Sequence, residues 1–415
     1  MSNRFRNRFL ALICLLAFVG LGVLFYTHWV VQRPFAIIVF VTDNLTSSSL
    51  TAARIYEGGA DNRLHLEKLD HLGLITTHAN DFAVSDTAAA ATAIATGQKV
   101  NNRLVGVDSA GKPLNNLLDL ARKNGRAVGL VTNGMISDTT PAAFYAKGGD
   151  PRDAQGLALQ LLNTANLDVI LGGGEGDFLP EHKDGRRKDG RDLMLEMRSK
   201  GYDIARNKAE LESTPAWKSP KLFGIFARDN MAYVDEIEAA GSQPSLSEMV
   251  QGAIQILQFH TKGYVLVVDV GLVGRAASEN KGERMLRELI ALDDAVATAV
   301  NYAGDNALIL VAGKQSVGGL RLNGYPFRND KGVAVVGINS QGIPSITWST
   351  GPGSKPTGDT NNSASVNPNE PSSVPSPAAI GVAEDGIVVG KGPGSEKLEG
   401  FKDNTDIFKV VTENL

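Results

Sequence analysis

The chain has 415 residues, of which 43% are hydrophobic, so it is long enough to bury a large core. Its 41 Lys and Arg against 45 Asp and Glu give a net charge of -4, which excludes the basic surface expected of a nucleic-acid-binding protein. Because Cys14 is the only cysteine and lies near the N-terminus, the rest of the chain can form no internal disulfide and no cysteine-based zinc site.

The N-terminal segment has the features of a membrane-spanning helix. Three arginines, the last of them Arg8, precede an uncharged apolar run from Phe9 to Tyr26. The run is near the lower limit of about 17 residues for a spanning helix, and the arginines place the N-terminus in the cytoplasm. We therefore expect residues 1–33 to form a cytoplasmic stub and a single-pass anchor in the inner or plasma membrane. The alternative is a cleaved signal peptide, although no small residues suited to cleavage follow the run.

Apolar runs alternate with helical patterns along the rest of the chain. The first run, Phe35–Val41, is rich in Val and Ile, which is typical of a strand buried on both faces. Similar apolar runs lie at 127–132, 168–171, 264–268 and 307–311. Helical patterns lie between the runs, at 114–123, 157–163 and 283–302. This alternation predicts one α/β domain over 34–415, with a doubly wound, mostly parallel central sheet flanked by helices, in the periplasm or outside the cell. Ligands bind beyond the carboxyl ends of such strands, so polar residues there are the first candidates for a site.

The stretch from Gly351 to Ala378 differs in composition from the rest of the domain. It is rich in Gly, Pro, Ser and Asn and has few apolar side chains to bury. Such a composition predicts a flexible, low-complexity loop. If the protein served only to bind a partner, this loop would be its natural interaction element.

An ordered set of motifs closely resembles the alkaline phosphatase family. The segment 84–93 reads VSDTAAAATA and resembles the family's nucleophile segment. Further similar blocks follow in the family's order at 129–143 (GLVTNGMISDTTPAA), 168–174 (DVILGGG), 263–269 (GYVLVVD), 292–296 (LDDAV), 307–320 and 392–408. The resemblance covers nearly everything after residue 34. It implies the alkaline phosphatase fold, hydrolysis of phosphate monoesters and assembly into homodimers.

The resemblance also implies a site in which a hydroxyl nucleophile lies between two zinc ions, beside a magnesium ion and a phosphate-binding arginine. Thr87 stands at the nucleophile position, where the family usually has serine. Asp43 and Thr140 match ligands of the magnesium ion, and Asp269 stands where the family has glutamate. We expect these three oxygen donors to hold one Mg²⁺. Arg152 lies one residue beyond the expected phosphate-binding arginine, and its planar guanidinium suits a phosphate group.

Each of these residues also has an ordinary structural interpretation. Asp86 and Thr87 can simply begin a helix, since Asp is a common cap residue. The three oxygen donors can be strand-end groups that bond to nearby backbone. Arg152 can be an exposed arginine at the start of a helix over 153–163.

The zinc positions implied by the resemblance are mostly replaced. The family's Thr-Ala-Asp-His block reads AGKQ at 312–315, Gly274 stands in place of a ligand aspartate, and Gly353 lies near the place of a late histidine. No histidine lies beyond residue 260. We therefore expect zinc to be absent and Lys314 to project into the vacated space. There its ammonium would pair with Asp43, because a buried carboxylate needs a compensating cation, and would also contact phosphate.

The sequence thus predicts a membrane-anchored, extracytoplasmic, alkaline phosphatase-like protein that is catalytically impaired or inactive and retains binding of a phosphate-containing ligand or of one Mg²⁺. Two alternatives remain. The first is an active phosphomonoesterase with Thr87 as nucleophile, which the nucleophile segment favours and the replaced zinc ligands oppose. The second is a structural or partner-binding envelope protein that has kept only the scaffold.

Overall fold

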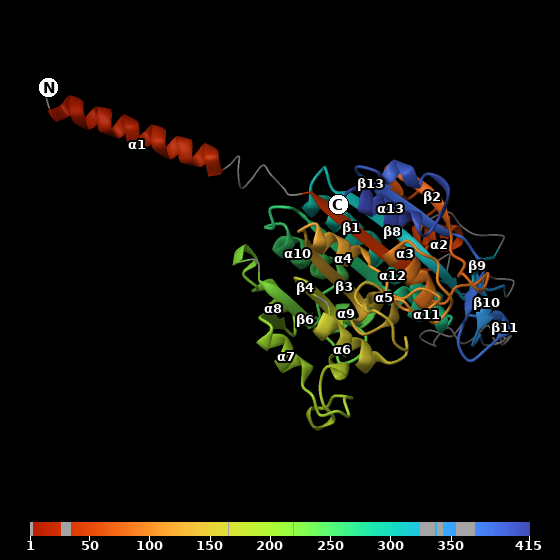
Figure 1. Cartoon of the computed structure of the whole chain (residues 1–415). Coiled ribbons are helices and arrows are strands. Elements are labelled where there is room, and N and C mark those ends of the chain that lie inside the picture. The colour runs from red at the N-terminus through yellow and green to blue at the C-terminus, as the bar shows by residue number, and fades with distance from the viewer. Residues whose placement is uncertain are drawn as a thin grey trace.

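A twisted sheet that runs through the whole domain forms the centre of the molecule (Figure 1). The computed structural model describes residues 3–25, 35–164, 166–218, 220–323, 337, 343–353 and 370–415. The strands of the sheet, in spatial order, are β14 (Gly400–Asp403), β2 (His71–Thr76), β13 (Gly386–Lys391), β8 (Leu308–Val317), β1 (Ala36–Asp43), β7 (Tyr264–Val270), β3 (Ala127–Met135), β4 (Val169–Gly173), β6 (Lys221–Ile225) and β5 (Tyr202–Ala205). The short β12 (Gly381–Val382) pairs with β8.

All pairings from β8 to β5 are parallel, whereas β13 runs antiparallel to both of its neighbours. The predicted doubly wound, mostly parallel α/β fold is therefore confirmed. The five strands predicted from apolar runs are β1, β3, β4, β7 and β8, and all five extend past the predicted carboxyl ends.

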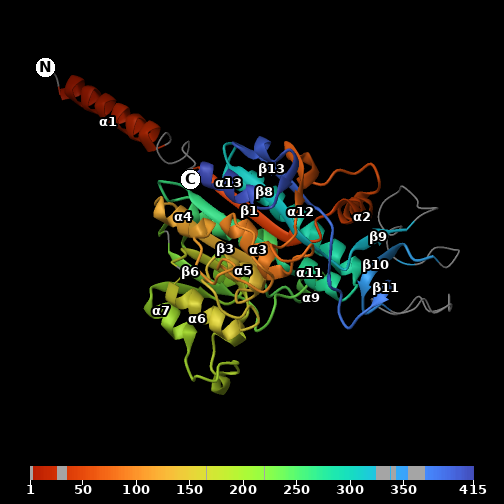
Figure 2. The same ribbon diagram turned by 45° about the vertical axis from the view of Figure 1, so that its right-hand side comes forward.

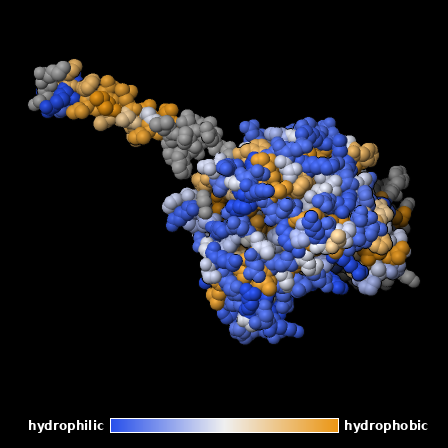
Figure 3. Space-filling view, in the orientation of Figure 1, coloured by the Kyte–Doolittle hydropathy of each residue, from blue (hydrophilic) through white to orange (hydrophobic). Residues whose placement is uncertain are grey.

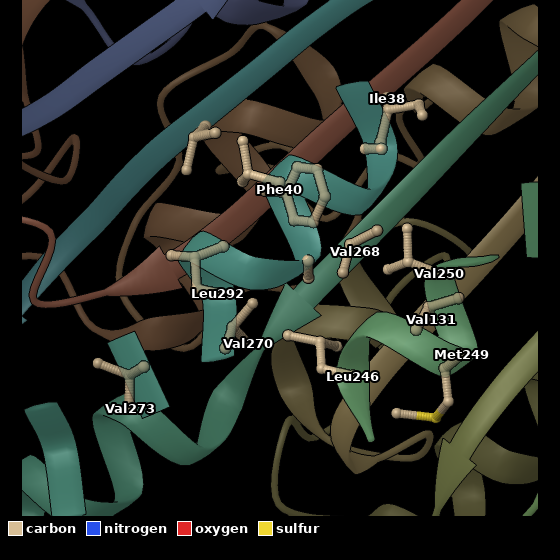
Figure 4. Close-up of a cluster of buried hydrophobic side chains, with 14 of the residues drawn as sticks. Ile38, Phe40, Val131, Leu246, Met249, Val250, Val268, Val270, Val273 and Leu292 are labelled. Carbon is tan, nitrogen blue, oxygen red and sulfur yellow. The ribbon is translucent and has the colours of Figure 1, made fainter. Parts of the chain in front are cut away.

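Each central strand is buried on both faces because its side chains alternate between two separate cores. In β1, Ile38 and Phe40 belong to one core and Ile37, Val39 and Val41 to the other. Figure 4 shows the first core, in which side chains of the central strands pack against those of α10, α11 and α12. A continuous run of Val and Ile is thus the pattern that this position in the sheet requires.

Helices cover both faces of the sheet. The first core is closed by helices that include α2 (Ser47–Gly58), α8 (Lys208–Glu212), α10 (Leu246–Leu257), α11 (Gly271–Ser278) and α12 (Gly282–Ala303), with α9 (Val234–Ala240) packed against α12. The second core is closed by α3 (Thr87–Thr96), α4 (Leu117–Lys123), α5 (Thr139–Ala143), α6 (Ala154–Thr164), α7 (Leu193–Ser199) and α13 (Asp406–Glu413).

A second, small sheet projects from one side of the domain near α11 (Figure 2). It consists of β9 (Leu320–Leu322), β10 (Ile346–Gly351) and β11 (Ser372–Pro375). The stretch predicted as a low-complexity loop, 351–378, thus contains the strand β11, which the prediction did not anticipate. Residues 354–369 of that stretch lie outside the described residues.

The N-terminal apolar segment forms the helix α1 (Asn3–Phe25), which stands out as a hydrophobic rod beside the largely hydrophilic surface of the domain (Figure 3). Within it, Arg4–Val23 is long and apolar enough to cross a membrane, and none of it is buried against the domain. A membrane span and a signal sequence both fit this helix.

Arg126 joins the two ends of the folded domain. Its guanidinium donates hydrogen bonds to the carbonyl oxygens of Phe35, Asn414 and Leu415 over 2.9 to 3.3 Å and lies over the Phe35 ring. The side chain is buried, and this burial lowers the pKa of the guanidinium. The C-terminus is therefore fixed beside the amino end of β1.

Candidate functional site

A cavity of about 780 Å³ opens at the carboxyl ends of the central strands. It is lined by four of the six residues that the sequence analysis selected, which are Asp43, Thr87, Thr140 and Asp269. The strand register explains this convergence, because Asp269 in β7 is paired with Val41 of β1, two residues before Asp43. Parallel strands that end together bring residues far apart in sequence to one place.

Lys314 and Asp43 form a buried ion pair beneath this cavity. Strands β1 and β8 are neighbours, and the Lys314 ammonium donates to Asp43 Oδ1. The two residues are only 1% and 6% exposed. The pair predicted from the sequence is therefore present, and a positive charge is buried behind Asp43, which lines the cavity.

Two further carboxyl groups lie close to this pair. Burial raises the pKa of Asp269 to about 7, although the nearby Lys314 and a 2.7 Å hydrogen bond from Thr132 to its Oδ2 oppose the rise. Burial also raises the pKa of Asp138 to about 6. Three carboxyl groups and one ammonium thus share a small buried volume, and a second cation would relieve their repulsion.

Asp138 was not selected from the sequence, although it lines the same cavity. It precedes α5, and its side chain does not cap that helix. The signal in the sequence was its place in the SDTTPAA motif, two residues before the predicted ligand Thr140.

Thr87 begins helix α3, as the Ala-rich sequence after it predicts. The Asp86 side chain caps the helix by accepting a hydrogen bond of 2.9 Å from the backbone N–H of Ala89. The Thr87 hydroxyl accepts a 2.9 Å hydrogen bond from the Gln315 amide. Among the described side chains this is its only hydrogen-bond partner, and an amide cannot remove the hydroxyl proton.

Arg152 lies outside this cavity and lines a neighbouring one of about 480 Å³. Its side chain is 86% exposed and forms an ion pair with Asp150, with both hydrogen bonds at 3.1 Å. Thr87 lines both cavities, so Arg152 is near the predicted nucleophile but already has a carboxylate partner. Arg103, which sequence reasoning missed, lines the same cavity as Arg152.

No histidine lines the main cavity in the described part of the chain. His65 lies elsewhere, with Asp293 and Asp294, and the potential ligand atoms of these three side chains are within 4.8 Å of one another. The two oxygens of Asp293 already accept hydrogen bonds from the backbone N–H groups of His65 and Leu66. Asp293 therefore already serves to cap the turn that begins at His65.

Gly274 in α11 gives the Asp43 carboxylate its space. A Cβ atom at this position would collide with Asp43 Oδ2. Glycine to alanine in a helix normally stabilises by about 1 kcal/mol, but we expect Gly274→Ala to destabilise by about 1–3 kcal/mol through this overlap. The free energy of unfolding in urea measures the effect.

Gly252→Ala in α10 is the matched control, since its added Cβ would meet only the end of the flexible Leu211 side chain. It is expected to be neutral or stabilising. Equal stability of the two alanine variants would contradict the conclusion that Gly274 leaves space for the Asp43 carboxylate.

Comparison with known proteins agrees with this architecture. The family model described as alkaline phosphatase matches residues 36–415. The chain is 30% identical to the tissue-nonspecific alkaline phosphatase isozymes of Felis catus and of Homo sapiens, over 90% of this chain and 82% of each relative. The Thermus thermophilus alkaline phosphatase structure is similar with a TM-score of 0.73 and 25% identity, and covers 92% of both chains. The chain therefore belongs to the alkaline phosphatase family.

Proposed function

We propose that this protein is a catalytically impaired member of the family that binds one Mg²⁺ and a phosphate-type anion instead of holding two zinc ions. The observation that carries the proposal is the buried pair between Lys314 and Asp43. A fixed ammonium on Asp43 opposes a divalent cation bound to the same oxygen, because the two positive charges would repel each other at short range.

The other positions implied for zinc support the same conclusion. Zinc in proteins is held mainly by imidazole, thiolate and carboxylate. The described cavity lining offers carboxylates but neither imidazole nor thiolate. Gly274 supplies no ligand, and the space that a side chain there would need is filled by the Asp43 carboxylate.

The oxygen donors that remain fit Mg²⁺, which prefers carboxylate, hydroxyl and water ligands. Asp269 Oδ1 is buried and has no hydrogen-bond partner, so one oxygen of the group lacks a compensating donor. Thr140 is 4% exposed, lines the cavity and makes no side-chain hydrogen bond within the described residues. Asp269, Thr140 and the other carboxylate oxygen of Asp43, Oδ2, which does not contact Lys314, would hold the ion, with Asp138 beside them. A bound Mg²⁺ would supply positive charge to the oxygens of a phosphate group.

One solved relative bears on the metal. A mutant of the TAB5 alkaline phosphatase, in which a histidine is replaced by glutamate, is described as having Mg bound in its M3 site. That structure has a TM-score of 0.70 and 21% identity to this chain and covers 92% of it. It supports Mg²⁺ as the metal to test first.

The surroundings of Thr87 favour slow turnover or none. Its hydroxyl accepts a hydrogen bond from the Gln315 amide, and an amide donor cannot take up the hydroxyl proton. A hydroxyl nucleophile requires either a base that accepts this proton or a metal ion that lowers the hydroxyl pKa. We further propose that α1 is a single-pass anchor in the inner or plasma membrane, that residues 34–415 lie in the periplasm or outside the cell, and that the domain forms a homodimer.

The test is a metal analysis and a phosphatase assay on the full-length chain purified in detergent, in buffer supplied with zinc and magnesium. We expect at most one equivalent of Mg²⁺, less than one of zinc, and a rate of phosphate-monoester hydrolysis that Thr87→Ala leaves unchanged. About two equivalents of zinc with Thr87-dependent turnover would overturn the proposal in favour of an active phosphomonoesterase. A protein that binds no Mg²⁺ and that phosphate does not protect against unfolding would overturn the proposal in favour of a structural role.

A further inference from the structure

We propose that Arg103 is the side chain that binds the anionic group of the ligand in the cavity beside Thr87, in place of Arg152. This inference rests on the phosphate-type ligand proposed above and adds a residue that the family motifs did not select. It is drawn from the backbone at Arg103, from the contacts that hold it there, and from the pairing of the charges in the cavity.

The backbone of Arg103 has an uncommon conformation, with a φ of 68°. Three other non-glycine residues in the described chain have positive φ, and they are Asn44, Asp184 and Asn280. Asn and Asp tolerate this left-handed region because their short side chains bond to the nearby backbone. Arginine has no such compensation. A strained residue persists where the surroundings enforce it, and such positions cluster at binding sites.

The surroundings that enforce this conformation come from the segment before helix α3. The backbone N–H of Arg103 donates a 2.7 Å hydrogen bond to Oδ2 of Asp86. Asp86 is also the residue whose side chain caps helix α3. The Asn102 side chain accepts a 2.8 Å hydrogen bond from the Asp86 backbone N–H and donates one of 3.0 Å to the Val84 carbonyl. Arg103 is thus fixed to the residue that precedes Thr87.

The charges around the cavity leave one arginine without a partner. Asp86 accepts two backbone hydrogen bonds, and Asp150 accepts two from the Arg152 guanidinium. The Arg103 guanidinium makes no ion pair and no side-chain hydrogen bond with any described residue, although its charge contributes to lowering the pKa of Asp150. It is exposed and lines the cavity. Of the charged groups that line the cavity, Arg103 is the one without a compensating contact.

The geometry favours a tetrahedral oxyanion such as phosphate. A guanidinium binds two oxygens of such a group at once, and these charge-assisted hydrogen bonds are stronger than neutral ones. Arg152 would have to leave the Asp150 carboxylate to do the same, whereas Arg103 loses no ion pair. Thr87 lines the cavity as well, so the bound anion would lie within reach of its hydroxyl.

The experiment measures the Kd for inorganic phosphate by titration calorimetry of the full-length protein in detergent. Arg103→Asn removes the charge but tolerates a positive φ, so the melting temperature is expected to stay within about 2 °C of the parent value. The Kd is expected to rise roughly tenfold or more. Arg103→Lys keeps the charge but cannot bind two oxygens with one planar group, so its Kd is expected to lie between those of the parent and of Arg103→Asn.

Arg63→Asn is the matched control, because Arg63 is also exposed and its only described hydrogen bond is to the neighbouring Asn62 carbonyl. It removes the same charge and is expected to leave the Kd unchanged. An unchanged Kd in Arg103→Asn, or an equal rise in both asparagine variants, would overturn the inference. So would a parent protein that binds Mg²⁺ but no phosphate. Zinc-dependent turnover would overturn the proposed function but not the inference on Arg103, because the comparison of phosphate Kd values does not depend on catalytic activity.

Discussion

Replacing Lys314 with methionine is expected to lower the free energy of unfolding by about 3–5 kcal/mol. Methionine has a similar length, so the volume of the site is largely kept, but Asp43 becomes a buried carboxylate without its ion-pair partner. The effect is measured by urea unfolding of the full-length protein in detergent with a metal chelator present, so that no added cation takes the place of the ammonium.

Two further variants distinguish loss of the pair from loss of any lysine. Lys409→Met breaks a pair between the exposed Lys409 and the partly buried Asp406 on α13 and is expected to change stability by less than about 1 kcal/mol. The double variant Asp43→Asn, Lys314→Met removes both buried charges and is expected to recover much of the loss. If Lys314→Met unfolds at the same urea concentration as the parent, the pair does not stabilise the folded site.

The second large effect concerns Glu370, which connects the small sheet to α12. Its Oε2 accepts hydrogen bonds of 2.7 Å from the Trp348 indole and 2.8 Å from the backbone N–H of Gly282. Burial raises the pKa of this carboxyl from 4.5 to about 7, and the two hydrogen bonds only partly oppose the rise.

A pKa that is raised in the folded state gives stability at low pH that is lost as the pH rises. The contribution of Glu370 is fully present below about pH 4.5 and is lost as the pH rises to about 7, and the loss is on the order of 3 kcal/mol. Glu370→Gln keeps the acceptor oxygen and cannot ionise. We expect its unfolding free energy to fall less than that of the parent between pH 5 and pH 8.

Urea unfolding at the two pH values measures this difference. Glu413→Gln is a suitable control, because Glu413 is exposed and pairs with the exposed Lys397 on the surface. It is expected to follow the parent at both pH values. An identical pH dependence in parent and Glu370→Gln would mean that Glu370 is not a protonated, buried group in the folded protein near neutral pH.

The parts of the fold that were predicted from sequence are those whose burial leaves a continuous pattern. The run at 35–41 is apolar without interruption because β1 is covered on both faces, and β7 gives the same signal. The strand β2, next to the edge strand β14, was missed because only part of it is buried and its pattern of apolar residues is weak. β13 was missed although it is buried, because its short apolar run, 387–389, has a glycine on each side.

The candidate site divides in the same way. Asp43, Thr87, Thr140 and Asp269 were found because each follows a strand or lies in a motif, and the structure brings all four to one cavity. Arg103 left no such signal. Its selection depends on a backbone angle and on the absence of a partner for its guanidinium among the residues that the structure describes, and neither property can be read from one sequence.

The attachment of both ends of the domain by Arg126 has a practical consequence. These ends lie beside the start of β1, whereas the cavity opens at the far end of that strand, eight residues away and so roughly 25 Å distant. Fusion partners, affinity tags or a solid support joined to either end therefore sit on the opposite pole from the opening. A domain immobilised in this way presents the cavity to the surrounding solution and not to the support.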